Sequence, residues 1–187
     1  MTQKLESINE NITILGFSNV KIEDPNSLLE QFRTEIKTPI QFFDAKFVAG
    51  KQHLYFAAVN ALNAFEKKTN ISNNLAVETL LYASGQRQIK KAVTMLGITQ
   101  GTTEIAALII PKNIQEKEKY IQIVTKTIPG KRNDNALELK DNKINAIKKL
   151  FEISNQEFEA KLKKEGLEKE ALTDLVIEHM ALLVTRS

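Results

Sequence analysis

The residues best suited to chemistry lie in one run, Glu78-Thr-Leu-Leu-Tyr82-Ala-Ser84-Gly85-Gln-Arg87-Gln-Ile-Lys90-Lys91-Ala. Its apolar first half, residues 76–83, predicts a strand, and Ser84-Gly85 predicts a tight break. The remainder predicts a helix from Gln86 to Leu96 whose first turns carry three cations. Arg87, Lys90 and Lys91 are three and four residues apart, so they would stack on one side of this helix. Helical spacing predicts that the opposite side faces the core through Ile89, Ala92, Val93 and Leu96.

A helix start of this kind is suited to binding an anion. The first backbone N–H groups of a helix lack partners within it, and the macrodipole places positive charge there. Gly85 would let an anion approach the backbone closely. The sequence therefore predicts a phosphate site at Gly85, with Arg87, Lys90 and Lys91 as the cations. A merely solvated cationic face is the alternative interpretation of the same residues.

Residues for acid–base or nucleophilic catalysis are scarce. The chain has two histidines, His53 and His179, and no cysteine. It lacks a G-x-S-x-G elbow and a G-x-x-x-x-G-K-[ST] loop. Gly97-Ile-Thr-Gln-Gly101 is glycine-rich but is followed by no lysine, so we expect it to turn a helix into a strand. We expect no enzyme activity, cofactor or metal, although a small-molecule enzyme of unrecognised type stays an alternative.

The composition is that of an ordinary globular protein. The 187 residues are 42% apolar and 26% charged, which predicts one domain spanning residues 1–187. A net charge of +3 permits an anionic partner without requiring one. The absence of cysteine indicates a reducing, cytoplasmic compartment. The longest apolar runs, such as 105–110, are too short to span a bilayer, so we expect no membrane association.

The elements that would position the cationic run are strands alternating with helices, followed by helices alone. This order predicts an α+β fold: a small mixed sheet of about four strands flanked by helices, with a helical C-terminal part. The strands are expected at 11–17, 43–48, 76–83 and 103–110, and the first two helices at about 24–36 and 51–67. The segment 114–128 is ambiguous, and 129–135 is a polar excursion. Further helices are expected near 141–150, 154–164 and 167–184.

The last of these helices is apolar around most of its circumference. Leu172, Leu175, Val176, His179, Leu182 and Leu183 form one stripe, and Ile177, Met180, Ala181 and Val184 extend it. Such a helix must be buried on more than one side. We therefore expect four of its side chains to meet another protein chain: Leu175, Ile177, Met180 and Val184. Complete burial within this domain is the alternative, and His179 is expected to be a core histidine.

The run at 78–92, together with Gly50-Lys-Gln-His53-Leu-Tyr-Phe-Ala-Ala and the alanine-rich helix after it, resembles the KEOPS subunit family that includes the PRPK-binding protein. The resemblance covers most of the chain. It implies a non-catalytic subunit of the complex that places threonylcarbamoyl on tRNA adenosine. Such a subunit binds and activates a kinase-like ATPase subunit, and in archaeal relatives it also grips the single-stranded 3′ CCA end of tRNA. The small sheet with surrounding helices fits the family fold.

The resemblance implies roles for further residues. The tRNA-binding candidates are then Ser84, Gln86, His53 and Lys51, in addition to Gly85, Arg87, Lys90 and Lys91. Tyr82 could stack a base, although a core position is the other interpretation, and Gln86 and Gln88 could read base edges. A regulator of the kinase-like subunit that does not bind tRNA directly is the alternative function.

Overall fold

The structure, a computed structural model, describes residues 12–111, 113–162 and 164–184, and of Arg33 and Val184 it describes the backbone alone. Contacts between Cα atoms divide the chain into two compact units. The first comprises the described residues up to Ala45 and those from Gly97 to Ala136. The second comprises Lys46–Leu96 and the described residues from Leu137 onward. One domain spanning the whole chain stays a prediction.

The first unit contains a four-stranded sheet in the order β2-β3-β1-β4. Its strands are β1 (Thr13–Ser18), β2 (Ile40–Asp44), β3 (Ile105–Ile109) and β4 (Lys131–Arg132). Each pairing is antiparallel, with Thr13 opposite Ile109 in β1–β3 and Ile40 opposite the same Ile109 in β2–β3. The predicted α+β class with about four strands is confirmed, and the sheet is antiparallel where a mixed one was expected.

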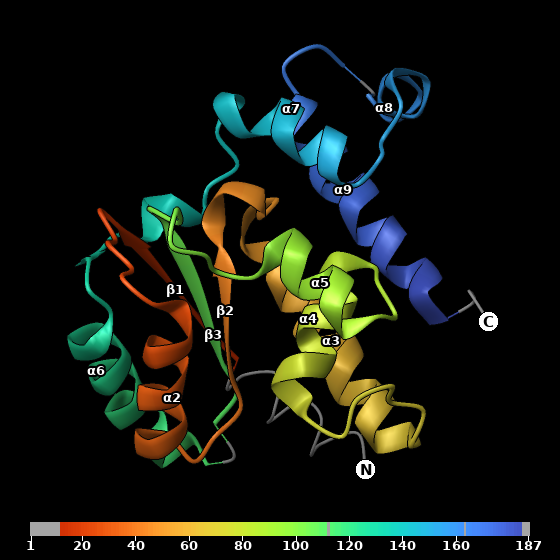
Figure 1. Cartoon of the computed structure of the whole chain (residues 1–187). Coiled ribbons are helices and arrows are strands. Elements are labelled where there is room, and N and C mark those ends of the chain that lie inside the picture. The colour runs from red at the N-terminus through yellow and green to blue at the C-terminus, as the bar shows by residue number, and fades with distance from the viewer. Residues whose placement is uncertain (1–11, 112, 163, 185–187) are drawn as a thin grey trace. The chain divides into compact units, whose positions relative to one another are not determined.

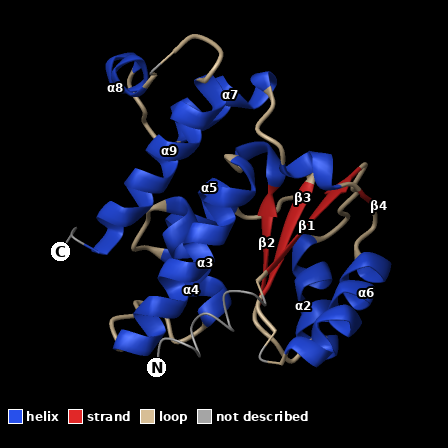
Figure 2. Ribbon diagram, turned by 180° about the vertical axis from the view of Figure 1, so that it is seen from behind, coloured by secondary structure: helices blue, strands red, loops and turns tan. Residues whose placement is uncertain are grey.

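Two helices, α2 (Pro25–Glu35) and α6 (Lys117–Thr127), lie beside one face of this sheet (Figures 1 and 2). Asp24 caps α2, because its carboxylate accepts hydrogen bonds from the backbone N–H groups of Asn26 and Ser27. The core between sheet and helices includes Leu15, Phe17, Phe32, Phe42, Ile105, Ala107, Ile109, Tyr120 and Val124. The ambiguous segment 114–128 contains the 3-10 turn η2 (Ile114–Glu116) followed by α6.

The second unit is helical. It holds α3 (Gly50–Lys67), α4 (Leu75–Ser84), α5 (Ile89–Leu96), α7 (Asp141–Leu150), α8 (Asn155–Lys161), α9 (Glu168–Ala181) and the 3-10 turn η4 (Leu182–Val184). Helix α9 packs against α3, α4, α7 and α8, and α4 also packs against α3 and α5. The predicted helical C-terminal part is confirmed.

The predicted strand at 76–83 is wrong, because these residues form helix α4. Asn74 caps this helix, with its side-chain oxygen accepting the N–H groups of Ala76 at 2.9 Å and Val77 at 3.2 Å. A short continuous apolar run fits a buried strand and a buried helix equally well. The cap at Asn74 and the packing of this segment against α3 and α5 decide for the helix.

Two smaller boundaries also differ. The strand expected at 43–48 is β2 at Ile40–Asp44, and Ala45–Phe47 form a 3-10 turn, η1. Pairing with β3 begins directly after Pro39, which explains the earlier start. The strand expected at 11–17 is β1, and its first residue, Asn11, lies outside the described residues.

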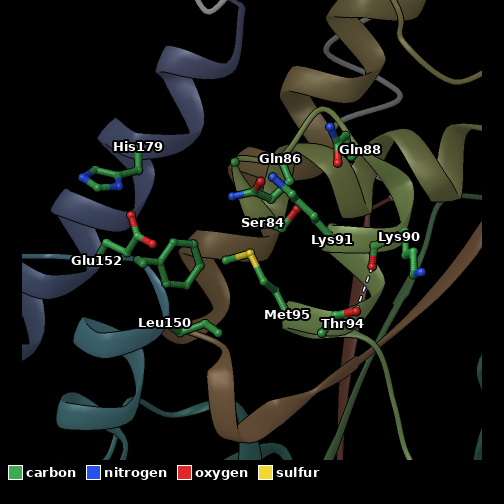
Figure 3. Close-up of a pocket in the computed structure, with 12 residues that line it drawn as sticks. Ser84, Gln86, Gln88, Lys90, Lys91, Thr94, Met95, Leu150, Glu152 and His179 are labelled. Carbon is green, nitrogen blue, oxygen red and sulfur yellow. Dashed lines mark hydrogen bonds between the residues drawn. The ribbon is translucent and has the colours of Figure 1, made fainter.

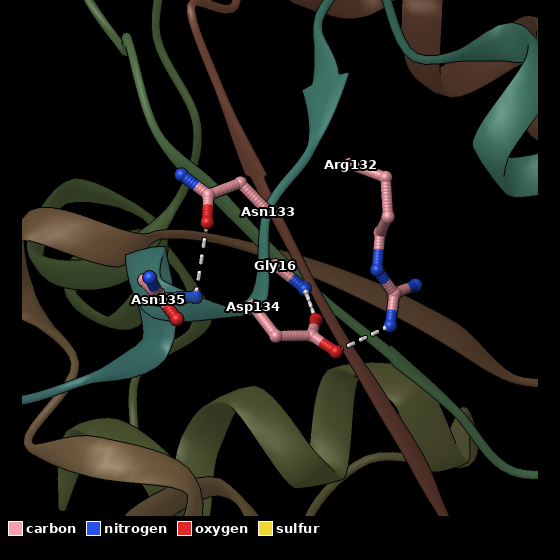
Figure 4. A network of polar contacts seen from close by, with 5 residues as sticks. All are labelled: Gly16, Arg132, Asn133, Asp134 and Asn135. Atoms are coloured by element: carbon pink, nitrogen blue, oxygen red, sulfur yellow. Dashed lines mark hydrogen bonds and ion pairs between the residues drawn. The ribbon is translucent and has the colours of Figure 1, made fainter.

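The polar excursion at 129–135 is tied to the sheet (Figure 4). It contributes β4 and leads into the 3-10 turn η3 (Asp134–Leu137). The carboxylate of Asp134 accepts the backbone N–H of Gly16 at 2.8 Å and pairs with Arg132 at 2.8 Å. The Arg132 guanidinium lies 5.6 Å from the centre of the Phe17 ring. These contacts make the excursion an ordered edge of the sheet.

Candidate functional site

An open groove of about 770 Å³ lies in the helical unit (Figure 3). Three segments that are distant in sequence form it: the α4–α5 turn with α5, the end of α7, and α9. Its lining residues are Ser84, Gly85, Gln86, Gln88, Lys90, Lys91, Thr94, Met95, Leu150, Phe151, Glu152 and His179. Five of the residues predicted to bind tRNA therefore lie around one groove, namely Ser84, Gly85, Gln86, Lys90 and Lys91.

Gly85 determines the course of the chain into the groove. It ends α4 in the left-handed conformation, with φ of 61°, which glycine adopts at least cost. The N–H of Gln86 then bonds to the carbonyl of Leu81 at 3.1 Å. A Cβ atom on Gly85 would lie 3.5 Å from the carbonyl oxygen of His179. The turn therefore packs closely against α9, which fixes both walls of the groove.

The cations divide into two groups. Lys90 and Lys91 are exposed in the first turn of α5 and line the groove. Arg87 does not line it, because its Nη1 donates to the carbonyl of Leu183 at 3.3 Å. Within the described part of the chain, no ion pair engages any of these three side chains.

The outer side of α5 differs from the prediction. Ala92 and Leu96 are fully buried, as expected, but Ile89 is 49% exposed and Val93 is 47% exposed. The helix begins at Ile89 rather than Gln86 and packs on its own unit along one narrow stripe. Ile89 and Val93 consequently share the solvent side with the lysines.

His53 is not at the surface. Its side chain is fully buried, its Nδ1 accepts the backbone N–H of Ala49 at 3.1 Å, and its Nε2 lies 2.8 Å from the carbonyl oxygen of Ala83. Since Nδ1 is an acceptor, Nε2 carries the proton and donates to Ala83. Burial lowers the pKa of His53 to about 4. The expectation that His53 contacts a nucleic acid is therefore wrong: it joins α3 to the end of α4.

Three other candidates also differ from a binding role. The Ser84 side chain is buried, and its hydroxyl donates to the carbonyls of Leu80 and Leu81 within α4. Lys51 is exposed but does not line the groove. Tyr82 is buried, and this burial raises the pKa of its phenol, in line with the core interpretation.

Sequence reasoning missed the wall of the groove opposite α5. Glu152 and His179 lie on that wall in Figure 3, across from Gln86 and Lys91. His179 was expected in the core, yet it is only half-buried. No spacing signal joins positions 86, 152 and 179, because only tertiary packing brings them together.

The partner-binding residues expected on α9 are mostly interior. Leu175 is 7% exposed and Met180 is fully buried, because α9 packs against four helices of its own unit. The expectation that these two side chains meet a partner is wrong. Ile177 is half-buried, and the side chain of Val184 lies outside the described residues. Leu182, which follows α9 directly, is a large apolar side chain that is 45% exposed.

The residues that the structure describes contain no group of three or more His, Asp or Glu side chains placed to hold a metal ion. Within the same part of the chain, no helix is both long and apolar enough to cross a bilayer.

The groove combines three kinds of surface. Lys90 and Lys91 offer cations, Gln86 and Gln88 offer amide groups, and Met95 with Phe151 offers an apolar surface. Such a lining suits a ligand with both charged and flat apolar parts.

Comparison with known proteins identifies the family. Residues 17–183 match the model of the family described as kinase binding protein CGI-121. The chain is 30% identical over 113 residues to a protein named regulatory protein Cgi121 from Methanocaldococcus jannaschii, which covers 60% of this chain and 70% of that protein. The family model spans most of the chain, and the chain belongs to the CGI-121 kinase binding protein family.

Proposed function

We propose that this protein is a non-catalytic accessory subunit of a KEOPS complex, in which it binds and activates the kinase-like ATPase subunit and recruits tRNA through its 3′ CCA end. The observation that carries the tRNA half is the groove, whose lining combines two exposed lysines, Lys90 and Lys91, with the aromatic and thioether side chains of Phe151 and Met95. Its volume of about 770 Å³ is large enough for one or two nucleotides and far too small for a duplex.

Single-stranded RNA is the nucleic acid that this lining favours. Unpaired bases are recognised by stacking and by contacts to their edges, while phosphates are bound by cations. Phe151 and Met95 can supply the apolar contact, Gln86 and Gln88 can bond base edges, and Lys90 and Lys91 can bind phosphates. We expect the gene product to act in the cytoplasm, as the lack of cysteine suggests.

The kinase half of the proposal rests on the family, whose description is kinase binding protein, and on the relative named as a regulatory protein. The helical unit has several exposed large apolar side chains that such a partner could contact, among them Tyr55, Phe56, Ile71, Ile89, Val93 and Leu182. A regulator that binds the kinase-like subunit without touching tRNA is the second candidate, because the same exposed apolar side chains would serve it equally.

The test is a binding titration with tRNA and with tRNA lacking its last three nucleotides, repeated over a range of salt concentrations. The informative variant is Lys90→Glu with Lys91→Glu, because Arg87 is engaged by Leu183 and its replacement could disturb the turn. The control is Lys67→Glu with Lys164→Glu, an equal charge change at exposed lysines of the same unit outside the groove.

We expect the trimmed tRNA to bind more weakly, and the groove variant to bind both forms weakly. Loss of two phosphate contacts to a single strand should reduce the slope of log K against log salt by roughly 1.4. Two outcomes would contradict the tRNA half of the proposal. One is equal affinity for whole and trimmed tRNA, and the other is an equal loss of affinity in the groove and control variants. Either outcome would favour the second candidate function, a regulator of the kinase-like subunit that does not bind tRNA directly.

A further inference from the structure

Glu152 is an unexpected residue in a groove that offers cations. It lines the groove on the wall opposite α5 (Figure 3). Its side chain is exposed, and it has no hydrogen bond or ion pair with any residue that the structure describes. A free carboxylate repels a phosphate, so this wall of the groove is suited to a different part of the ligand from the part that Lys90 and Lys91 would hold.

The backbone at Glu152 has a conformation that favours glycine. After α7 ends, Glu152 has φ of 55°, and the N–H of Ile153 bonds to the carbonyl of Lys148 at 2.9 Å. This is the helix-end turn in which glycine is usual, because other residues are strained there. Lys68 ends α3 in the same conformation, but it does not line the groove. At position 152 the chain thus keeps a carboxylate in the groove at the cost of backbone strain, which is a reason to look for a function.

We propose that Glu152 is a specificity residue: its carboxylate accepts a hydrogen bond from the exocyclic amine of a base bound in the groove, and the groove thereby discriminates against uracil. The inference rests on the proposed binding of a single-stranded RNA end. It adds a preference that binding through phosphates does not require.

The chemistry follows from which groups donate. An ionised carboxylate can only accept hydrogen bonds. Cytosine and adenine present the amines N4 and N6, and guanine presents N2, whereas uracil carries carbonyl oxygens and no amine. A strand whose phosphates follow Lys90 and Lys91 would turn its bases across the groove toward Glu152. An amine at this position donates a hydrogen bond to the Glu152 carboxylate. A uracil carbonyl at the same position would instead place a second acceptor against the carboxylate, and no hydrogen bond could form between them.

The experiment uses two short single-stranded RNAs of equal length, one ending in CCA and one ending in UUU, titrated against the full chain. We expect the wild-type protein to bind the CCA strand about tenfold more tightly, the size of one hydrogen bond to a charged group. In Glu152→Gln the preference should fall to less than about twofold, because an amide both donates and accepts. Glu159→Gln, an exposed glutamate on α8 outside the groove, should keep the wild-type ratio.

Glu152→Gly separates recognition from a structural role. Glycine relieves the strain at this position, so the variant should lose the preference while its thermal midpoint stays level or rises. A lower midpoint with weaker binding of both strands would show that Glu152 is structural and overturn the proposal. Equal binding of both strands by the wild type would overturn the proposal while leaving the tRNA function intact. Binding of neither strand would overturn both.

Discussion

The burial of His53 predicts a specific dependence of stability on pH. This imidazole is fully buried, and its neutral form is held by a hydrogen bond from the Ala49 N–H and another to the Ala83 carbonyl. Protonation would put a hydrogen on Nδ1, directly against the Ala49 N–H, and would place a charge in the interior. Both effects disfavour the charged form in the folded state, and the pKa of His53 falls from 6.5 to about 4.

The magnitude follows from the two pKa values. Between pH 6.5 and about 4 the unfolded chain binds a proton that the folded chain does not, so stability must decrease as the pH falls through this window. Each pH unit is worth about 1.4 kcal/mol, so the free energy of unfolding should fall by roughly 3 kcal/mol across it. The contribution is fully present above the unfolded pKa and is lost as the pH approaches the folded value.

The assay is urea unfolding followed by circular dichroism at intervals from pH 7.5 to 4. His53→Gln should be less stable than the wild type at pH 7 because it loses the imidazole contacts, but its stability should lack this slope, so that the two curves converge near pH 4. The carboxyls of Asp24, Glu157 and Glu168 have lowered pKa values and titrate in both proteins. Comparison of the two curves therefore isolates the histidine.

The matched control is His179→Gln, since His179 is the other histidine of the chain and is only half-buried. This variant should retain the wild-type slope. If His53→Gln kept the wild-type slope as well, or if His179→Gln removed it, the assignment of the acid sensitivity to the buried imidazole would be refuted.

Three further predictions concern stability. Glu78→Gln should lower the free energy of unfolding, measured with urea, by about 1–3 kcal/mol. The buried carboxylate accepts hydrogen bonds from the N–H groups of Ile71 and Ser72, and an amide would set a donor against one of them. A loss no larger than that of the same substitution at an exposed glutamate would contradict this. Gly130→Ala should lower the free energy of unfolding by about 1–3 kcal/mol in the same assay, because a Cβ atom there would lie 2.7 Å from Val20 Cγ2 and 3.0 Å from the backbone oxygen of Ser18. An unchanged free energy of unfolding would mean that the loop moves freely. Glu152→Gly should raise the free energy of unfolding by about 0.5–1 kcal/mol through relief of the left-handed backbone, and a loss of stability would argue against strain at this position.

Local patterns in the sequence predicted much of the fold. Asp24-Pro25 marks the start of α2, the apolar β-branched run before Phe17 marks β1, and the spacing of Leu54, Ala58 and Ala61 marks α3. Each of these signals acts within a few residues, so it can be read without knowing what the segment packs against. The cationic cluster is of the same kind, because Lys90 and Lys91 are neighbours in the chain.

Other features depend on partners distant in sequence. The segment 76–83 is apolar enough for a buried strand or a buried helix, and the cap at Asn74 together with packing against α3 and α5 makes it a helix. His53 has the residue type of a binding group, yet its Nε2–H group donates its hydrogen bond to the Ala83 carbonyl inside the protein.

The sequence by itself determined the α+β class, the resemblance to a kinase-binding family and the position of the cations along the chain, because short-range periodicity and motif residues suffice for these. Only the tertiary structure decided that Lys90 and Lys91 share a groove with Glu152 and His179, that Arg87 is engaged by Leu183, and that Leu175 and Met180 are interior. The physical reason is that a groove is defined by side chains whose distance along the chain carries no information about their distance in space.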